Sequence, residues 1–205
     1  MVLSKTRTFL AYLTGLWKIY FIRRFKYLWK KYNILRSSPR RCLEYRILPY
    51  IYAHREYQNI LFVGVAGCTV HYEDYLSHKK NLWTIDLDPE KAVSGMKGRH
   101  FVDSIENIDK YFWDGQLDAV IMNGVYGWGL DDETALDNSL KKIFRALRPG
   151  GLLVFGWDKT PKHDPIGLDD RPHFSDYKDF DIFGRSRIEL DNKHHHIYSF
   201  HKKPE

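Results

Sequence analysis

The chain has 205 residues, a formal net charge of +6 and 43% hydrophobic residues. This composition is close to that of globular domains and excludes wholesale disorder, and the length suits one domain whose core needs no disulfide support. The charge is unevenly divided, since residues 1–43 hold eleven basic and no acidic residues, whereas residues 44–205 hold 21 basic and 26 acidic ones. We therefore expect a basic helical extension, residues 1–38, followed by an acidic globular domain, residues 39–205, and a nucleic-acid-coating protein is disfavoured.

The basic extension contains an amphipathic segment. At about 100° per residue, residues 21–32 place aromatic and aliphatic side chains on one helical face and cations such as Arg23, Arg24 and Lys30 on the other. Three interpretations stay open. The apolar face docks on the chain's own core, or residues 9–32 lie on an anionic membrane surface, or the segment binds nucleic acid, which is the least favoured of the three.

The two cysteines, Cys42 and Cys68, are too few for a disulfide framework and favour a reducing compartment. The apolar run of residues 9–22 is followed by Arg23 and Arg24 and by no small-residue cleavage site, so a cleaved signal peptide is disfavoured. We expect a cytoplasmic protein, with the inner face of a membrane as the place of any lipid contact.

From residue 40 onward the pattern alternates between helix and strand. A helix is expected over 40–48, ending at Pro49. Buried apolar runs predict five parallel strands, over residues 59–65, 82–87, 100–102, 117–122 and 152–157. Between them we expect helices over residues 71–77, after Asp88-Pro89-Glu90 and over residues 134–147, and a closing hairpin of residues 184–190 and 194–201. This order predicts an α/β fold, a three-layer doubly wound sheet that is mostly parallel and binds ligands at the carboxyl ends of its strands.

Glycines and polar residues follow these strands. Gly64 and the small Ala66 follow the first strand, where they allow a ligand close to the backbone. Asp86 ends the second strand, and its carboxylate can accept from two hydroxyl groups. Asp103-Ser104 follows the third strand and Asn123-Gly124 the fourth, and an Arg-Pro-Gly-Gly turn, residues 148–151, precedes the fifth.

In this order the motifs resemble those of the class I (Rossmann-like) S-adenosylmethionine-dependent methyltransferases, over roughly residues 59–157. The resemblance implies a seven-stranded sheet whose last strands form a hairpin, and S-adenosylmethionine as cofactor. It also implies cofactor contacts from the glycine turn, the ribose-binding acid, the adenine-binding pair and the residue beside the methionine part. These cofactor-binding residues would be Gly64, Val65, Ala66, Asp86, Leu87, Asp103, Ser104 and Asn123.

The activity that the resemblance implies is methyl transfer to a small-molecule, glycan or lipid acceptor. Two alternatives stay open. A binding module without catalysis is one, because Phe62, Ala66 and Cys68 replace an acidic residue and two glycines of the family's first motif. The other is a nicotinamide-dependent oxidoreductase, since a small-residue turn followed by an acid about 20 residues later also occurs in dinucleotide-binding folds.

A catalytic base is needed only where the acceptor must lose a proton. We name His163 as the candidate, because histidine titrates near neutrality. The others lie beyond the predicted strand ends as well: Tyr126, Asp131, Asp158 and His173.

Two further features of the sequence are candidate ligand sites. Trp128 lies between two glycines, which suggests a loop at the active-site mouth that stacks on a planar or sugar-like substrate, or simply a packed tryptophan. His194 and His196 would share one face of a strand. No third ligand occurs at a supporting spacing, so we expect no metal site.

Overall fold

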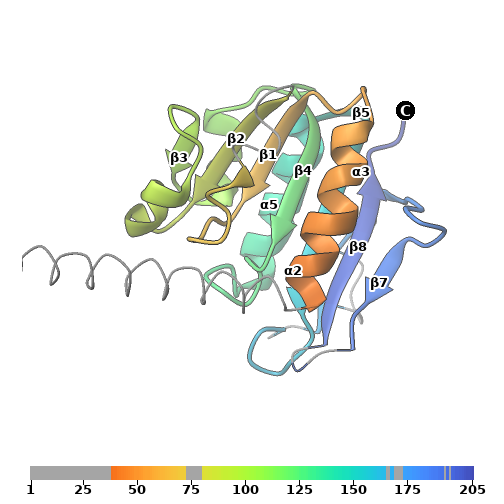
Figure 1. The fold of residues 1–205 in the computed structure, drawn as a ribbon. Helices are drawn as coiled ribbons and strands as arrows, with labels where there is room; N and C mark the ends of the chain where they lie inside the picture. The colour runs from red at the N-terminus through yellow and green to blue at the C-terminus, as the bar shows by residue number, and fades with distance from the viewer. Residues whose placement is uncertain (1–37, 73–79, 165–166, 169–172, 192, 194) are drawn as a thin grey trace, which may run out of the picture.

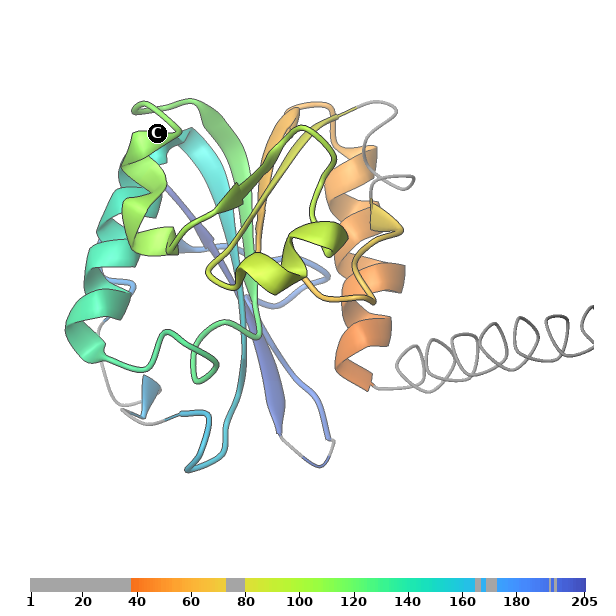
Figure 2. The same cartoon turned by 90° about the vertical axis from the view of Figure 1, so that its left-hand side faces the viewer.

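The computed structural model describes residues 38–72, 80–164, 167–168, 173–191, 193 and 195–205. The amphipathic segment of residues 9–32 and most of the helix expected over 71–77 lie outside the described residues. Within them, a central sheet is covered by helices on both faces, so that Figure 2 shows three layers, with the sheet seen nearly edge-on between them.

The sheet runs in the order β3-β2-β1-β4-β5-β8-β6, and β7 also pairs with β8. The strands from β1 to β5 pair in parallel, and β8 is antiparallel to β5, β6 and β7. The predicted α/β class, parallel sheet and closing hairpin are therefore confirmed, and the two-residue β6 is an addition that the sequence did not indicate. The strands are β1 (Asn59–Val63), β2 (Asn81–Asp86), β3 (His100–Val102), β4 (Leu117–Asn123), β5 (Leu147–Asp158), β6 (Lys178–Asp179), β7 (Arg187–Glu189) and β8 (His196–Lys202).

Two helical layers enclose the sheet. One face is covered by α5 (Glu133–Ala146) and the 3-10 helix η3 (Ile105–Lys110), and the other by a continuous rod of α2 (Ser38–Cys42), η1 (Leu43–Ile47) and α3 (Leu48–Ala53) (Figures 1 and 2). The 3-10 helix η2 (Pro89–Ser94) follows β2. The start of α2 lies beside the carboxyl end of β4 (Figure 1).

The sequence predicts that the first helix ends at Pro49, and this prediction is wrong. The turn before this proline, η1, is π-helical, and the backbone N–H of Leu48 donates to the carbonyl of Leu43, five residues earlier. Pro49 then occupies the first turn of α3, where its missing N–H and its ring are tolerated. The wider π turn thus lets the helix pass through a proline, and it ends only at Ala53.

Alternating side chains give the sheet two buried faces. In β1, Leu61 and Val63 belong to the cluster around α5, whereas Ile60 and Phe62 pack in the cluster around the α2–α3 rod. Each fully buried aliphatic or aromatic side chain contributes about 1.5–3 kcal/mol. Burial on both faces explains why the strands appear in the sequence as continuous apolar runs.

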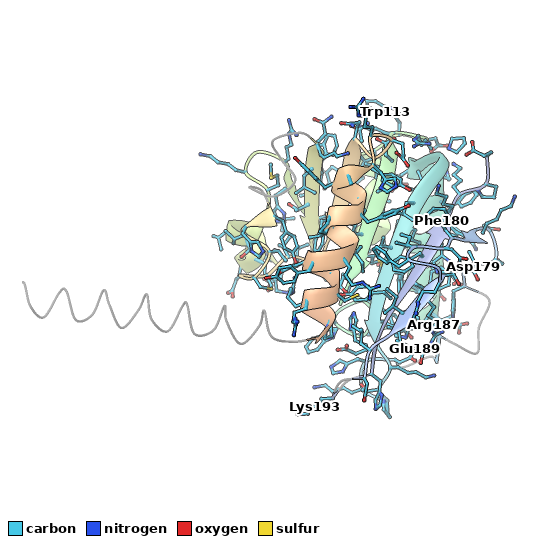
Figure 3. All side chains as sticks on the ribbon, turned by 45° about the vertical axis from the view of Figure 1, so that its right-hand side comes forward. Trp113, Asp179, Phe180, Arg187, Glu189 and Lys193 are labelled. Atoms are coloured by element: carbon cyan, nitrogen blue, oxygen red, sulfur yellow. The ribbon has the colours of Figure 1, made fainter. Side chains whose placement is uncertain are left out.

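The amino ends of the strands are joined by Asp118. Its Oδ2 accepts hydrogen bonds from the backbone N–H groups of Gln58 (2.9 Å) and Asn59 (2.7 Å), and its Oδ1 accepts from Nε of Arg148 (2.7 Å). The Arg-Pro-Gly-Gly segment, which the sequence predicted as a turn before the strand, forms the start of β5, and Arg148 connects it to the starts of β1 and β4. This end of the sheet, near which the exposed Trp113 lies (Figure 3), is structural.

The outer edge of the sheet carries charge. Asp179, Phe180, Arg187 and Glu189 lie along this edge beyond β8 (Figure 3), and Arg187 Nη2 lies 2.9 Å from Glu189 Oε1. Charged side chains at an edge oppose pairing with another chain. Among the described residues, no helix has both the length and the apolar character needed to cross a bilayer.

Candidate functional site

A cavity of about 430 Å³ opens at the carboxyl ends of β1, β2, β3 and β4. It is formed by the loops that follow these strands, where the strand order places ligands in folds of this type. All eight residues that the sequence assigned to the cofactor line this cavity: Gly64, Val65, Ala66, Asp86, Leu87, Asp103, Ser104 and Asn123.

The turn after β1 needs glycine at position 64. Gly64 has a φ of +82°, and a Cβ there would lie 2.8 Å from Cγ2 of Val125. Its N–H donates to the Ile85 carbonyl (2.9 Å), and the N–H of Ala66 donates to Oγ1 of Thr69 (3.1 Å). The turn is thus fixed by its own hydrogen bonds, with no side chain at Gly64 between the backbone and the cavity.

Asp86 joins this turn to the second strand. The buried carboxylate accepts a hydrogen bond from the Val65 N–H on Oδ2 (2.7 Å) and one from the Asp88 N–H on Oδ1 (2.9 Å). Nζ of Lys91 lies 3.8 Å from Oδ1. An ionised carboxylate offers about four acceptor positions. Asp86 therefore keeps acceptor capacity for hydroxyl groups of a ligand.

Asp103 is held more tightly. Oδ1 accepts from the Ser104 N–H and Asn107 Nδ2, both at 2.7 Å, and Oδ2 accepts from Tyr111 Oη (2.9 Å) and Lys110 Nζ (3.1 Å). The hydrogen bonds from Asn107 and Tyr111 are the main reason why the pKa of this carboxyl lies well below its usual range. A ligand amino group at Asp103 would have to share an oxygen or displace Lys110, whose side chain is 58% exposed.

The wall after β4 contains Asn123. Its Oδ1 lies 3.1 Å from Nε2 of His196, and Nδ1 of the same ring lies 2.6 Å from Oδ1 of Asp158. From the sequence, His196 was a candidate metal ligand and Asp158 a candidate base. The structure instead places both behind Asn123, outside the cavity lining.

His163, the proposed base, does not line the cavity. It is buried, its ring stacks on that of Trp128 with centroids 4.3 Å apart, and Nδ1 lies 3.1 Å from Oγ1 of Thr160. Trp128 itself lines the cavity and is 60% exposed, but the face of its indole ring that stacks on His163 is covered. His163 therefore supports the Trp128 loop in this structure, and its role as a base stays a prediction.

The remaining candidate bases are dispersed. Tyr126 is fully buried in the core, and His173 pairs with Asp137 (2.6 Å) on α5. Asp131 accepts a hydrogen bond from the Gly129 N–H (3.3 Å). None of these three lines the cavity.

Two cations in the cavity lining were missed by the sequence. Arg40, at the start of α2, donates to Tyr72 Oη and lies 3.9 Å from Oε1 of Glu44. Nothing local marks it, because it is one of the eleven basic residues within residues 1–43 and lies far in sequence from the strand ends. Lys91 carried a signal, since it follows the acid that ends β2 by little more than one helical turn.

No protein-family model matches the chain, and no curated protein sequence matches it. Solved structures do. The N-methyltransferase NodS from Bradyrhizobium japonicum WM9, in complex with S-adenosyl-L-homocysteine, is 14% identical with a TM-score of 0.60, and the match covers 86% of this chain and 97% of NodS.

Two other structures are similar in the same way. A 1,6-didemethyltoxoflavin-N1-methyltransferase from Burkholderia thailandensis, with 1,6-didemethyltoxoflavin and S-adenosylhomocysteine bound, is 15% identical (TM-score 0.55; 77% of this chain and 76% of that chain). An rRNA methylase from Streptococcus thermophilus is 14% identical (TM-score 0.53; 78% and 95%). The chain therefore has the fold of the class I S-adenosylmethionine-dependent methyltransferases.

Proposed function

We propose that the chain is an S-adenosylmethionine-dependent methyltransferase that acts on a small-molecule, glycan or lipid acceptor. The observation that carries this proposal is the convergence of the Gly64 turn and the buried Asp86 carboxylate on one cavity, in a fold shared with methyltransferases.

The residues of the cavity fit this cofactor. The absent side chain at Gly64 leaves room against the backbone, and Asp86 has acceptor capacity for the two ribose hydroxyls. Leu87, which is 61% exposed, and Ile105 offer apolar surface for a planar base between Asp86 and Asp103. The cofactor supplies a sulfonium methyl group that is already activated for displacement by a nucleophile. The protein's contribution is then to orient cofactor and acceptor in line and to exclude water.

The strand order disfavours the nicotinamide alternative. Dinucleotide-binding folds of the common type continue with parallel strands in the order 3-2-1-4-5-6. Here the strand next to β5 is β8, which is antiparallel to it. The alternative of a binding module without catalysis shares the cavity and is separated by experiment.

Calorimetry with S-adenosylmethionine and S-adenosylhomocysteine tests the cofactor. We expect both to bind the full chain, and a folded chain that binds neither would refute the proposal. NADH serves as the comparison ligand, and preferential binding of NADH would support the oxidoreductase instead.

The acceptor class is tested with methyl-labelled S-adenosylmethionine and fractionated cell extract. We expect label in the small-molecule or glycolipid fraction, and label confined to RNA would overturn the proposed acceptor class. Binding of the cofactor without transfer to any fraction would favour the non-catalytic module.

A further inference from the structure

Three polar side chains from three different strands meet behind the cavity wall. Asn123 ends β4, Asp158 ends β5 and His196 begins β8. The His196 ring bridges the other two, at 2.6 Å to the Asp158 carboxylate and 3.1 Å to the Asn123 amide oxygen. Of the three, only Asn123 lines the cavity.

Gly156 provides the space for this arrangement. It pairs with Asn123 of β4 on one side and with Tyr198 of β8 on the other. A Cβ at this position would overlap the Asn123 amide oxygen and would lie 2.8 Å from the Tyr198 ring. Because the side chain is absent, the Asn123 amide reaches across β5 to His196.

The ring of His196 has an oxygen at each nitrogen, Asp158 Oδ1 at Nδ1 and Asn123 Oδ1 at Nε2. An imidazole nitrogen binds an oxygen acceptor as an N–H donor, so this arrangement fits an imidazole that carries an N–H on both nitrogens. The Asp158 carboxylate, 17% exposed, compensates the resulting charge. Within the described ranges, the ring of Tyr198 packs against that of His196 with centroids 4.6 Å apart, and Cys42, Arg40 and Tyr72 lie around Tyr198. Burial raises the pKa of Tyr198, which stays neutral and donates to the Pro39 carbonyl (3.0 Å).

The oxygen of Asn123 is thus held by His196, and its NH₂ group is directed away from that ring. Within the described part of the chain, Nδ2 makes no hydrogen bond, although the residue lines the cavity. An amide NH₂ offers two N–H donors and no lone pair. Arg40 and Lys91 also line the cavity, and their cationic groups only donate, although the Arg40 guanidinium already binds Tyr72 Oη and lies 3.9 Å from Glu44 Oε1. An amide NH₂ group beside these cations suits an oxygen with free lone pairs, above all a carboxylate.

We infer that Asp158 and His196 are positioning residues that hold the Asn123 NH₂ group toward the cavity, where it donates to a carboxylate of the bound small molecule. The inference rests on the proposed function, because one source of this carboxylate is the amino-acid end of the cofactor. An acidic acceptor is the other source. A neutral His196 would reverse the arrangement, since its Nε2 would accept from Asn123 and the amide oxygen would face the ligand.

The orientation is read directly by ¹⁵N NMR of the His196 ring at pH 7, assigned with the His196→Gln chain. We expect both ring nitrogens to be protonated in the full-length wild-type chain and one proton to be lost in Asp158→Asn. Asp137→Asn is the matched control, because it removes the carboxylate of another 2.6 Å aspartate–histidine pair that lies outside the cavity lining. An unprotonated Nε2 in the wild-type chain would overturn the inference.

Calorimetry then identifies the source of the carboxylate. The two ligands are S-adenosylhomocysteine and 5′-methylthioadenosine, which lacks the amino-acid end. If the carboxylate is that of the cofactor, Asn123→Asp and Asp158→Asn weaken S-adenosylhomocysteine binding at least tenfold and leave 5′-methylthioadenosine binding within twofold. The single variant His196→Gln keeps near wild-type affinity for S-adenosylhomocysteine, because the glutamine NH₂ group can still donate to the Asn123 oxygen.

The other outcomes are distinct. Unchanged affinity for both ligands, with His196 doubly protonated, assigns the carboxylate to the acceptor. Equal weakening of both ligands overturns the inference, because it marks a general loss of structure. A wild-type chain that binds neither ligand refutes the proposed function, and the NMR result still decides the orientation of Asn123.

Discussion

The replacement of Asp86 by asparagine tests the cofactor site most directly. The substitution keeps the size of the side chain but removes its charge and one of its two acceptor oxygens. In the structure, one carboxylate oxygen accepts from the Val65 N–H and the other from the Asp88 N–H. An asparagine can satisfy only one of these N–H groups with its oxygen, so fewer acceptor positions remain for a ligand.

The size of the effect follows from the strength of charged hydrogen bonds. A hydrogen bond to a charged group contributes about 1.5–3 kcal/mol, whereas a neutral one contributes about 0.5–1.5 kcal/mol. When two ribose hydroxyls donate to a neutral amide instead of a charged carboxylate, the loss is about 2 kcal/mol, or roughly 30-fold in Kd. Loss of the ion pair with the half-exposed Lys91 adds little, because solvent screens it.

The assay is calorimetric titration of the Asp86→Asn chain with S-adenosylhomocysteine and 5′-methylthioadenosine. Both ligands carry the ribose, so Asp86→Asn should weaken the binding of both by the same factor. The Asn123 and Asp158 variants should instead weaken only S-adenosylhomocysteine binding. Asp88→Asn is the matched control, because Asp88 also lies near Lys91 and caps η2, a role that asparagine retains, but does not line the cavity. An Asp86→Asn chain that is folded and binds within twofold of wild type would remove Asp86 from the site.

Three further predictions concern stability and partners. Burial lowers the pKa of His201 to about 4 and outweighs the opposing attraction of Asp179. The unfolded chain binds this proton already near pH 6.5, so the contribution of neutral His201 to folding stability is complete above about pH 6.5 and is lost as the pH falls toward 4. The wild-type free energy of unfolding should therefore drop by roughly 3 kcal/mol more than that of His201→Phe between pH 7 and pH 4, and parallel denaturant curves would contradict this. Asp118→Asn should lower the free energy of unfolding by about 1–3 kcal/mol, since it leaves a backbone N–H or Arg148 without its acceptor, and an unchanged denaturation midpoint would exclude this role. Full-length protein should float with anionic liposomes and protein lacking residues 1–36 should not, and equal behaviour would end the membrane interpretation.

The parts of the site that the sequence predicted are those that follow strands. The strands β1 to β4 were recognisable as runs followed by a glycine or a polar residue, and parallel strands bring their carboxyl ends to one edge of the sheet. For this reason residues as distant as Gly64 and Asn123 were expected near one another, and both line the cavity. The roles of these residues toward the cofactor stay predictions.

A local pattern was misleading where helix geometry changed. Pro49 was expected to end a helix, but the π turn before it allowed the helix to continue. The location of His163 could not be read from its chemistry, and the structure packs it against Trp128, outside the cavity lining. Its role as a base stays a prediction. Backbone geometry in the first case and a packing partner in the second are properties that composition does not report.

The sequence by itself determined the fold class and the strand ends that surround the cavity, because hydrophobic periodicity and turn residues are local properties. Only the tertiary structure brought Arg40 to the cavity and joined Asn123, Asp158 and His196. The bond between Asn123 and His196 spans 73 residues, and that between Asp158 and His196 spans 38. Such contacts depend on which strands are neighbours and in what register, and here on the missing side chain of Gly156, so they follow from the assembled sheet.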